Sequence, residues 1–257
     1  MSPWRLVIST PQQASLNMGI DEVLLASAVA RSQPVLRLYS WDPPAVSIGY
    51  AQAVERHIHL DRCRQQGIPI VRRMTGGKAV FHDLEVTYCL SGPPDRIPFI
   101  GDLMTSYRTI ASALLRMLTA FGLNGKMAPA DTRASRVGIS SCFAAASAYE
   151  ITIDDRKIIG SAQKRTQNGI LQHGSILLDY QEERWRELMC RGTEGSMGHV
   201  TSLMEAMGAA VSKDDVISAM VRAFEDEFGM RFEREDMDEL EQDHARQVSI
   251  CRYPNLA

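Results

Sequence analysis

The stretch that decides the fold runs from residue 72 to residue 83 and reads RRMTGGKAVFHD. It joins two strand-like segments, residues 68–73 and 86–90. Its adjacent glycines allow the backbone to approach a ligand closely, because no side chain intervenes. Arg73 and Lys78 place positive charge beside exposed backbone N–H groups. The stretch therefore predicts a loop that could hold an anion or a polarised carbonyl group.

Two other interpretations of this loop must be weighed. A phosphate-binding P-loop requires glycine at position 72 and serine or threonine at position 79, but the chain has Arg72 and Ala79. That motif is excluded. An ordinary Gly-Gly hairpin turn with solvated charges stays open, and it would be the preferred interpretation if the loop stood alone.

Outward from this loop, apolar periodicity predicts strands first and mostly helices afterwards. The predicted strands are residues 4–9, 35–39, 45–48, 68–73, 86–90, 149–153, 157–162 and 175–178, and the predicted helices are residues 14–32, 103–121 and 214–228. In the helix over 103–121 we expect Leu103, Tyr107, Ile110, Leu114, Met117 and Phe121 to form a core stripe. The polar turn Asp154-Asp155-Arg156 predicts an antiparallel hairpin. From residue 181 onward the pattern is helical, so the order of elements favours an α+β fold.

Composition narrows the class of protein. The 257 residues are 45% hydrophobic and 23% charged, which is typical of a globular chain with a sizeable core. The net charge of -3 disfavours a dedicated nucleic-acid binder. No apolar run approaches the roughly 18–20 residues of a membrane span, and the N-terminus lacks the plan of a signal peptide. We therefore expect a cytoplasmic protein with neither a nucleic-acid nor a membrane partner.

The five cysteines form no C-x-x-C pair, which argues against a zinc site or a disulfide framework. Cys142 follows two serines and precedes a run of small residues, so its thiol is the best candidate nucleophile, although a lone cysteine is more often a small buried residue. We expect the buried role for Cys63, Cys89, Cys190 and Cys251.

Two further segments could carry chemistry. Residues 157–165, KIIGSAQKR, begin with Lys157 beside apolar neighbours, which predicts a partly desolvated lysine next to small residues that leave room for a ligand. The alternative is a solvated hairpin lysine. His173 precedes a glycine and an apolar run, and it could act as a base or donor, or simply bond to the backbone; His82 has the same two possibilities. His57, His59, His199 and His244 show no metal-ligand spacing, so we predict no metal.

Four motifs in one order resemble the lipoate-protein ligase and octanoyltransferase family. They are residues 72–83 with 85–88, Lys157 with 160–163, and 172–175. The resemblance extends from residue 16 to at least residue 178. It implies the α+β catalytic fold shared with biotin ligases, a mixed, largely antiparallel sheet with flanking helices and an acyl-binding tunnel. With it we expect a catalytic domain over residues 1–200 and a helical extension over 201–257.

The resemblance is greater to the cysteine-dependent branch, which transfers octanoate from octanoyl-acyl carrier protein. Thr75-Gly76-Gly77 stands where the ligases carry three glycines, and Cys142 falls where this branch carries its nucleophile. Lys78 departs from the arginine common in the branch, and residues 246–257 do not match its usual ending. The acceptor implied is a lipoyl-domain protein, such as glycine cleavage H protein or a dehydrogenase E2 subunit, and no cofactor is needed.

The resemblance also implies the site residues. Cys142 and Lys157 would be catalytic, and the substrate-binding residues would be Arg73, Thr75, Gly76, Gly77, Lys78, His82, Gly160, Ser161, Ala162, His173 and Gly174. Three alternatives stay open: a ligase that uses ATP and Mg to form lipoyl-adenylate, an octanoyl amidotransferase between lipoyl-domain proteins, and a non-catalytic partner-binding subunit.

Overall fold

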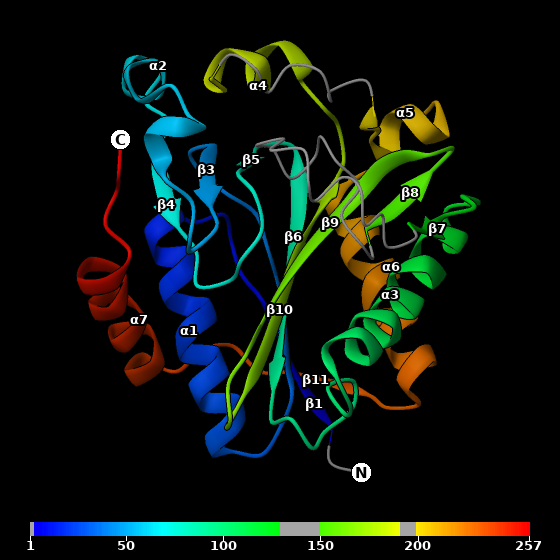
Figure 1. Ribbon diagram of the computed structural model, residues 1–257. Coiled ribbons are helices and arrows are strands. Elements are labelled where there is room, and N and C mark those ends of the chain that lie inside the picture. Colours follow the sequence, from blue (N-terminus) through cyan, green and yellow to red (C-terminus); the bar gives the residue numbers. More distant parts are fainter. Residues whose placement is uncertain (1–2, 129–149, 191–198) are drawn as a thin grey trace.

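Two fully buried strands form the centre of the main sheet. In the computed structural model, which describes residues 3–128, 150–190 and 199–257, β6 (Glu85–Gly92) and β10 (Ile170–Leu177) are buried at every position. They pair antiparallel, from Glu85 opposite Leu177 to Gly92 opposite Ile170. Burial of both faces of a strand requires layers on both sides of the sheet, and helices provide them (Figure 1).

The main sheet has eight strands in the order β11-β1-β2-β6-β10-β9-β8-β7. Two pairings, β1 with β2 and β1 with β11, are parallel, and the other five are antiparallel. The expected mixed, largely antiparallel α+β sheet is thereby confirmed. Besides β6 and β10, its strands are β1 (Trp4–Ile8), β2 (Val35–Tyr39), β7 (Lys126–Met127), β8 (Ile151–Ile153), β9 (Arg156–Arg165) and β11 (Phe232–Arg234).

The predicted hairpin is present between β8 and β9. Ile153 pairs with Arg156, and the two turn residues Asp154 and Asp155 have φ of 48° and 60°. Two consecutive positive φ angles are the signature of the two-residue turn that matches strand twist, and aspartate tolerates them better than most residues. The hairpin places Lys157 on β9, two residues after the turn.

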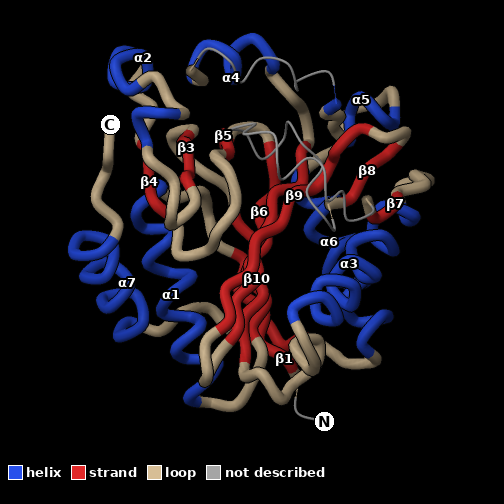
Figure 2. The backbone as a smooth tube through the Cα atoms, in the orientation of Figure 1, coloured by secondary structure: helices blue, strands red, loops and turns tan. Residues whose placement is uncertain are grey.

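Two pairs of helices cover the two faces of the main sheet (Figure 2). On one face lie α1 (Ala14–Ala30) and α7 (Glu239–Arg252), and on the other lie α3 (Leu103–Ala120) and α6 (Lys213–Phe228). The α1–α7 contact is tight, because a Cβ at Gly19 would lie 2.5 Å from the Ala245 carbonyl oxygen. The smaller helical elements are η1 (Val54–Arg56), α2 (Leu60–Gln65), α4 (Glu182–Leu188) and α5 (Leu203–Met207).

The predicted apolar stripe of α3 is only partly correct. Ile110, Leu114 and Met117 are buried in the core that α3 shares with α6. Leu103 is 44% exposed, because Asp102 caps the helix and its first turn lies at the surface. The core stripe therefore begins about two turns into the helix.

A second, three-stranded sheet has the order β4-β3-β5, with β3 (Ala45–Ile48) in the middle, β4 (Ile70–Arg72) parallel to it and β5 (Val80–His82) antiparallel. Sequence analysis did not predict β5. Residues 73–79 consequently cross from one edge of this sheet to the other, past the end of β3, and do not form a hairpin turn between paired strands. The loop packs closely against the residue that follows β3, because a Cβ at Gly49 would lie 2.1 Å from the Gly77 carbonyl oxygen.

The C-terminal residues pack against the eight-stranded main sheet. The segment predicted as helical contains a strand, β11, which pairs with β1 at the sheet edge. Glu241 of α7 binds the buried Arg5 of β1 through two hydrogen bonds of 2.7 Å. The boundary expected at residue 200 stays a prediction, and elements from both sides of it contribute to one core. None of the helices in residues 3–128, 150–190 and 199–257 is both long and apolar enough to cross a membrane.

Candidate active site

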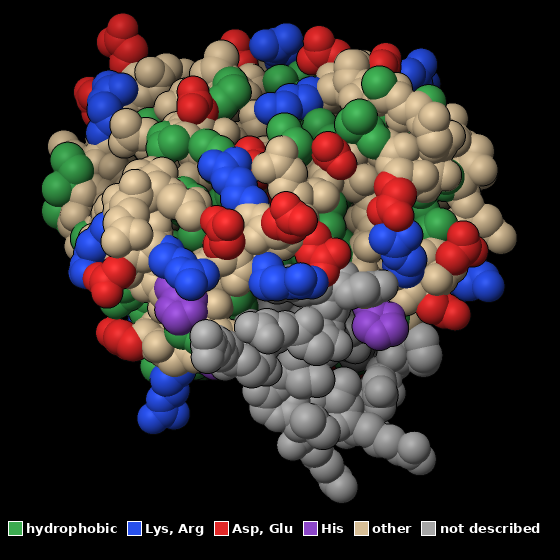
Figure 3. Space-filling model, turned by 90° about the horizontal axis from the view of Figure 1, so that it is seen from above, with side chains coloured by type: hydrophobic (Ala, Val, Ile, Leu, Met, Phe, Trp, Pro, Cys, Tyr) green, Lys and Arg blue, Asp and Glu red, His purple; other side chains and the backbone are tan. Residues whose placement is uncertain are grey.

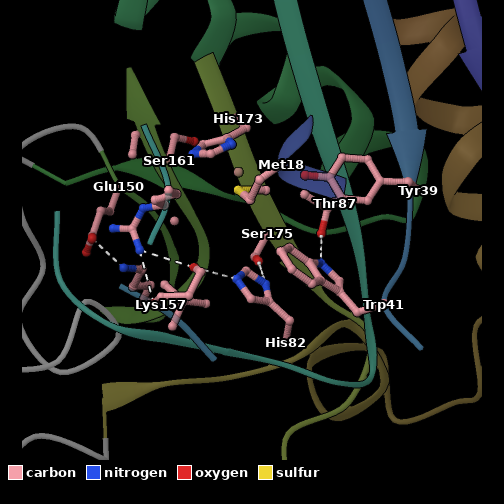
Figure 4. A pocket seen from close by; sticks show the side chains of 16 residues that line it. Met18, Tyr39, Trp41, His82, Thr87, Glu150, Lys157, Ser161, His173 and Ser175 are labelled. Carbon is pink, nitrogen blue, oxygen red and sulfur yellow. Dashed lines mark hydrogen bonds and ion pairs between the residues drawn. The ribbon is translucent and has the colours of Figure 1, made fainter. Parts of the chain in front are cut away.

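A pocket lies where the two sheets face each other. It is lined by side chains from α1, β2, β3, β5, β6, β9 and β10 and has an empty volume of about 460 Å³ including its open mouth (Figure 4). Met18, Tyr39, Trp41 and Val80 give it apolar walls. The apolar walls fit an uncharged chain, whereas the polar groups that converge on the pocket suit a reacting carbonyl.

The structure brings together most of the residues predicted from sequence. The predicted residues that line the pocket are Arg73, His82, Lys157, Gly160, Ser161, Ala162, His173 and Gly174. Thr75, Gly76, Gly77 and Lys78 form the adjoining loop. Cys142 lies outside the described residues.

Lys157 is only 2% exposed, so a fully solvated hairpin lysine is excluded. Its Nζ forms an ion pair with Oε1 of Glu150, which is itself buried. A buried ammonium needs a counterion to offset its lost hydration. Sequence reasoning did not assign a role to Glu150, although its place just before the hairpin is a signal that could have been read.

The buried side chain of Arg73 binds the backbone of the glycine loop. The side chain is 4% exposed, and Nη2 donates to the carbonyl oxygens of Gly76 at 2.7 Å and Lys78 at 2.8 Å. Gly77 has a φ of 91°, a conformation that disfavours any side chain. The loop shape thus depends on a buried guanidinium as well as on its glycines.

His173 lies in a buried polar chain that connects α1 to the loop. Its Nδ1 is 3.4 Å from Oδ2 of Asp21, and its Nε2 is 2.7 Å from Oγ1 of Thr75. Burial lowers the pKa of His173 below 6.5, against the opposing effect of Asp21. Burial raises the pKa of Asp21, but the His173 hydrogen bond and the charge of Arg37 outweigh it and leave the pKa below 3.8.

His82 lies in a second buried polar chain. Its Nδ1 is 2.8 Å from Oε1 of Glu85 and its Nε2 is 2.7 Å from Oγ of Ser47, while the ring stacks on Trp41 at 3.9 Å between centroids. Burial raises the pKa of Glu85, but the charge of His82 and three hydrogen bonds outweigh it and hold the pKa below 4.5. Glu85 lies in the motif 85–88 and Asp21 within the range of the resemblance, but no site role was predicted for either residue.

The small residues of β9 and β10 shape the floor of the pocket. A Cβ at Gly174 would lie 2.6 Å from Tyr88 Cε1 and 2.7 Å from the Gly160 carbonyl oxygen. Tyr88 in turn is hydrogen-bonded to Ser161 at 2.7 Å. Glycine at position 174 is therefore required by the close approach of neighbouring atoms.

The other cysteines behave unequally. Cys63 and Cys89 are buried as predicted, and burial raises the pKa of the Cys63 thiol to about 11. The prediction was wrong for Cys251, which is exposed near the end of α7, and Cys190 is only partly buried. Within the part of the chain that the structure describes, no group of three or more His, Cys, Asp or Glu side chains could hold a metal ion.

The face that carries α2, α4 and α5 mixes acidic and basic side chains (Figure 3). No field of a single sign covers the part of that face that the structure describes, which agrees with the small net charge.

Comparison with known proteins identifies the family. The model of the lipoyl protein ligase A/B catalytic domain matches residues 13–225. The chain belongs to this family. The matched residues include the glycine loop, both buried polar chains and every residue that lines the pocket. Among curated relatives, "Octanoyltransferase LipM" of Kyrpidia tusciae is 35% identical over 98% of this chain and 97% of its own. The protein of the same name from Bacillus subtilis is 31% identical over 97% of this chain and 95% of its own.

Solved structures confirm the fold. A lipoate-protein ligase A bound with ATP superposes with a TM-score of 0.82 at 24% identity, covering 97% of this chain and 95% of its own. A bi-partite lipoate protein ligase from Thermoplasma acidophilum has a TM-score of 0.80 at 24% identity, with 98% and 93% covered. The relatives named above confirm the expected enzyme class, an acyltransferase of this family.

Proposed function

We propose that this enzyme transfers an octanoyl group from octanoyl-acyl carrier protein to a lysine of a lipoyl-domain protein, through a thioester on Cys142. The observation that carries the proposal is the buried Lys157, placed by the β8–β9 hairpin in a pocket with apolar walls. The names of its full-length relatives support octanoyl as the group transferred. Burial of the acyl chain would supply affinity at roughly 0.8 kcal/mol per methylene.

In the first half-reaction the Cys142 thiolate attacks the carbonyl carbon of the octanoyl thioester. The bond to the carrier sulfur breaks, and the carrier leaves as a thiol after taking up a proton. A cation favours the thiolate over the thiol, so the Lys157 ammonium is suited to stabilise the nucleophile or the developing oxyanion. Thioester exchange is nearly balanced in free energy and needs no ATP.

In the second half-reaction the neutral amine of the acceptor lysine attacks the Cys142 thioester. The amide forms, the carbon–sulfur bond breaks, and the proton lost by the amine returns to the cysteine sulfur or to solvent. Because an amide is more stable than a thioester, this step drives the transfer. The acceptor would be a lipoyl-domain protein of the kind found in glycine cleavage or in dehydrogenase complexes.

Intact-protein mass spectrometry tests the proposal. Purified wild-type protein and Cys142→Ser are mixed with octanoyl-acyl carrier protein without ATP. We expect an octanoyl adduct on the wild type that is absent from the variant, and transfer of that adduct when a lipoyl domain is added. An adduct of equal yield on Cys142→Ser would refute the thioester route.

Two further arms separate the rival activities. Acylation of the lipoyl domain that requires ATP and survives loss of Cys142 would identify a ligase. An adduct that forms from an octanoylated lipoyl-domain protein, and not from the carrier, would identify an amidotransferase.

A further inference from the structure

Ser47, His82 and Glu85 form a hydroxyl–imidazole–carboxylate chain. Ser47 Oγ lies 2.7 Å from His82 Nε2, and His82 Nδ1 lies 2.8 Å from Glu85 Oε1. A nucleophile within hydrogen-bond reach of a base, with a third group orienting that base, is the arrangement of activated serines on many folds. The thioester route proposed for Cys142 assigns no role to Ser47 or Glu85.

The partners of Glu85 define the direction of proton transfer. Its two carboxylate oxygens accept hydrogen bonds from the Thr87 hydroxyl at 2.5 Å and the Ser175 hydroxyl at 2.7 Å, as well as from His82. A carboxylate so surrounded by donors is ionised, so we assign the proton on the imidazole to Nδ1. Nε2 is then left as the acceptor of the Ser47 hydroxyl proton.

The orientation of the imidazole is restricted by packing. Trp41 stacks on His82 with an interplanar angle of 11°, and Trp41 Nε1 donates to Thr87 Oγ1 at 2.7 Å. The base therefore sits in a rigid slot between an indole ring and a carboxylate. Such restraint is what a general base needs to hold one attack geometry.

Ser47 contacts the Arg73 guanidinium and borders the pocket. Arg73 Nη1 lies 3.1 Å from Ser47 Oγ, where its charge would stabilise an alkoxide or an oxyanion. Both Ser47 and His82 line the apolar-walled pocket, although Ser47 is only 1% exposed to bulk water. A ligand that enters this pocket would therefore reach the hydroxyl from the enclosed side.

We propose that Ser47 is a second nucleophile, and that the enzyme hydrolyses medium-chain acyl esters and thioesters at the Ser47–His82–Glu85 triad. The Ser47 oxygen attacks the acyl carbonyl carbon while its proton passes to His82 Nε2. The bond to the leaving oxygen or sulfur breaks, and that atom takes the proton from His82. Water then attacks the serine ester with His82 as base, which releases the carboxylic acid and restores the serine hydroxyl.

An octyl fluorophosphonate, which forms a stable bond to activated serine oxygens with loss of fluoride, tests this directly on the folded protein. The experiment uses Cys142→Ala, so that no reaction at that thiol contributes. We expect a single adduct, mapped by peptide mass spectrometry to Ser47. An adduct confined to another residue, or none under conditions that label a standard serine hydrolase fully, would overturn the proposal.

Hydrolysis of p-nitrophenyl octanoate provides the functional arm. In the same Cys142→Ala background, Ser47→Ala and His82→Gln should each lower the rate of hydrolysis at least tenfold. Ser106→Ala is the matched control, because Ser106 is an equally buried serine whose hydroxyl binds Gln163 outside the pocket. Equal rates in Ser47→Ala and Ser106→Ala would refute a nucleophilic Ser47. If Ser47→Ala does not fold, the adduct position in the unmutated serine background still decides.

Discussion

Asp21 Oδ2 in the first helix lies 3.4 Å from His173 Nδ1 in β10, a contact between residues 152 positions apart. Asp21 also accepts hydrogen bonds from Arg37 at 2.8 Å and from the Tyr39 hydroxyl at 2.9 Å. This buried cluster connects α1 to the sheet and, because His173 in turn contacts Thr75, to the glycine loop. The loop that marks the family is therefore held by groups from across the chain.

The first prediction concerns acid. Burial lowers the pKa of His173 in the folded protein below its ordinary value of 6.5. At a pH between the folded and the unfolded pKa, the unfolded chain therefore binds a proton that the folded protein does not. Stability should then fall as the pH drops below about 6.5, by up to ~1.4 kcal/mol per pH unit for this one group. His173→Gln should remove that part of the slope. The exposed His244→Gln is the control, and unfolding in urea between pH 7.5 and 5.5 is the measurement; identical slopes in wild type and His173→Gln would contradict the prediction.

The second prediction concerns the buried Lys157–Glu150 ion pair. Removing one partner breaks this ion pair while the other charge stays buried, so Lys157→Met and Glu150→Gln should each lower the free energy of unfolding by about 3–5 kcal/mol. The double variant should recover much of that loss and still fail to form the octanoyl adduct. Urea unfolding and the mass assay separate the two effects. Activity in the double variant would show that the lysine acts only in packing.

The third prediction concerns Gly174. Its added methyl would meet a backbone carbonyl oxygen and an aromatic ring at 2.6–2.7 Å, so Gly174→Ala should destabilise the protein by about 1–3 kcal/mol and reduce acyl binding. Gly76→Ala is the matched control, because nothing lies within 4 Å of its added Cβ. Its stability should stay within about 0.5 kcal/mol of wild type. Thermal unfolding of both variants tests this, and equal losses would disprove the steric argument.

The fourth prediction concerns the contact between the first strand and the last helix. Burial raises the pKa of Glu241, but the hydrogen bonds from Arg5 and Ser27 prevail and lower it to about 2. A depressed carboxyl pKa contributes stability that is present above the unfolded value near 4.5 and is lost as the pH falls toward 2. Glu241→Gln should lower the unfolding midpoint at pH 7 and flatten its fall below pH 4.5.

Glu239→Gln, an exposed carboxylate in the first turn of the same helix, is the control for this helix. Chemical denaturation at pH 7 and pH 3 measures both variants. If Glu241→Gln matched Glu239→Gln at pH 7, residues 239–252 would not be stabilised through Arg5.

The local sequence pattern was enough to predict α3, α6 and the hairpin around Asp154-Asp155, because helical periodicity and turn formation depend on only a few neighbouring residues. It failed for β5, whose three residues have too little pattern to show which strand they pair with. It also placed Leu103 in the core, since periodicity does not show where a helix emerges at the surface. The position of Cys142 relative to Lys157 stays a prediction, because Cys142 lies outside the described residues.

The sequence by itself determined the family, the glycine loop and part of the pocket lining, because these are written as short motifs in a definite order. Only the tertiary structure decided their partners. Glu150 beside Lys157, Asp21 beside His173, and Ser47 beside His82 are pairs separated by 7, 152 and 35 positions. Buried polar groups must find partners inside the fold, and which partner each finds depends on how sheets and helices pack, which no local pattern records.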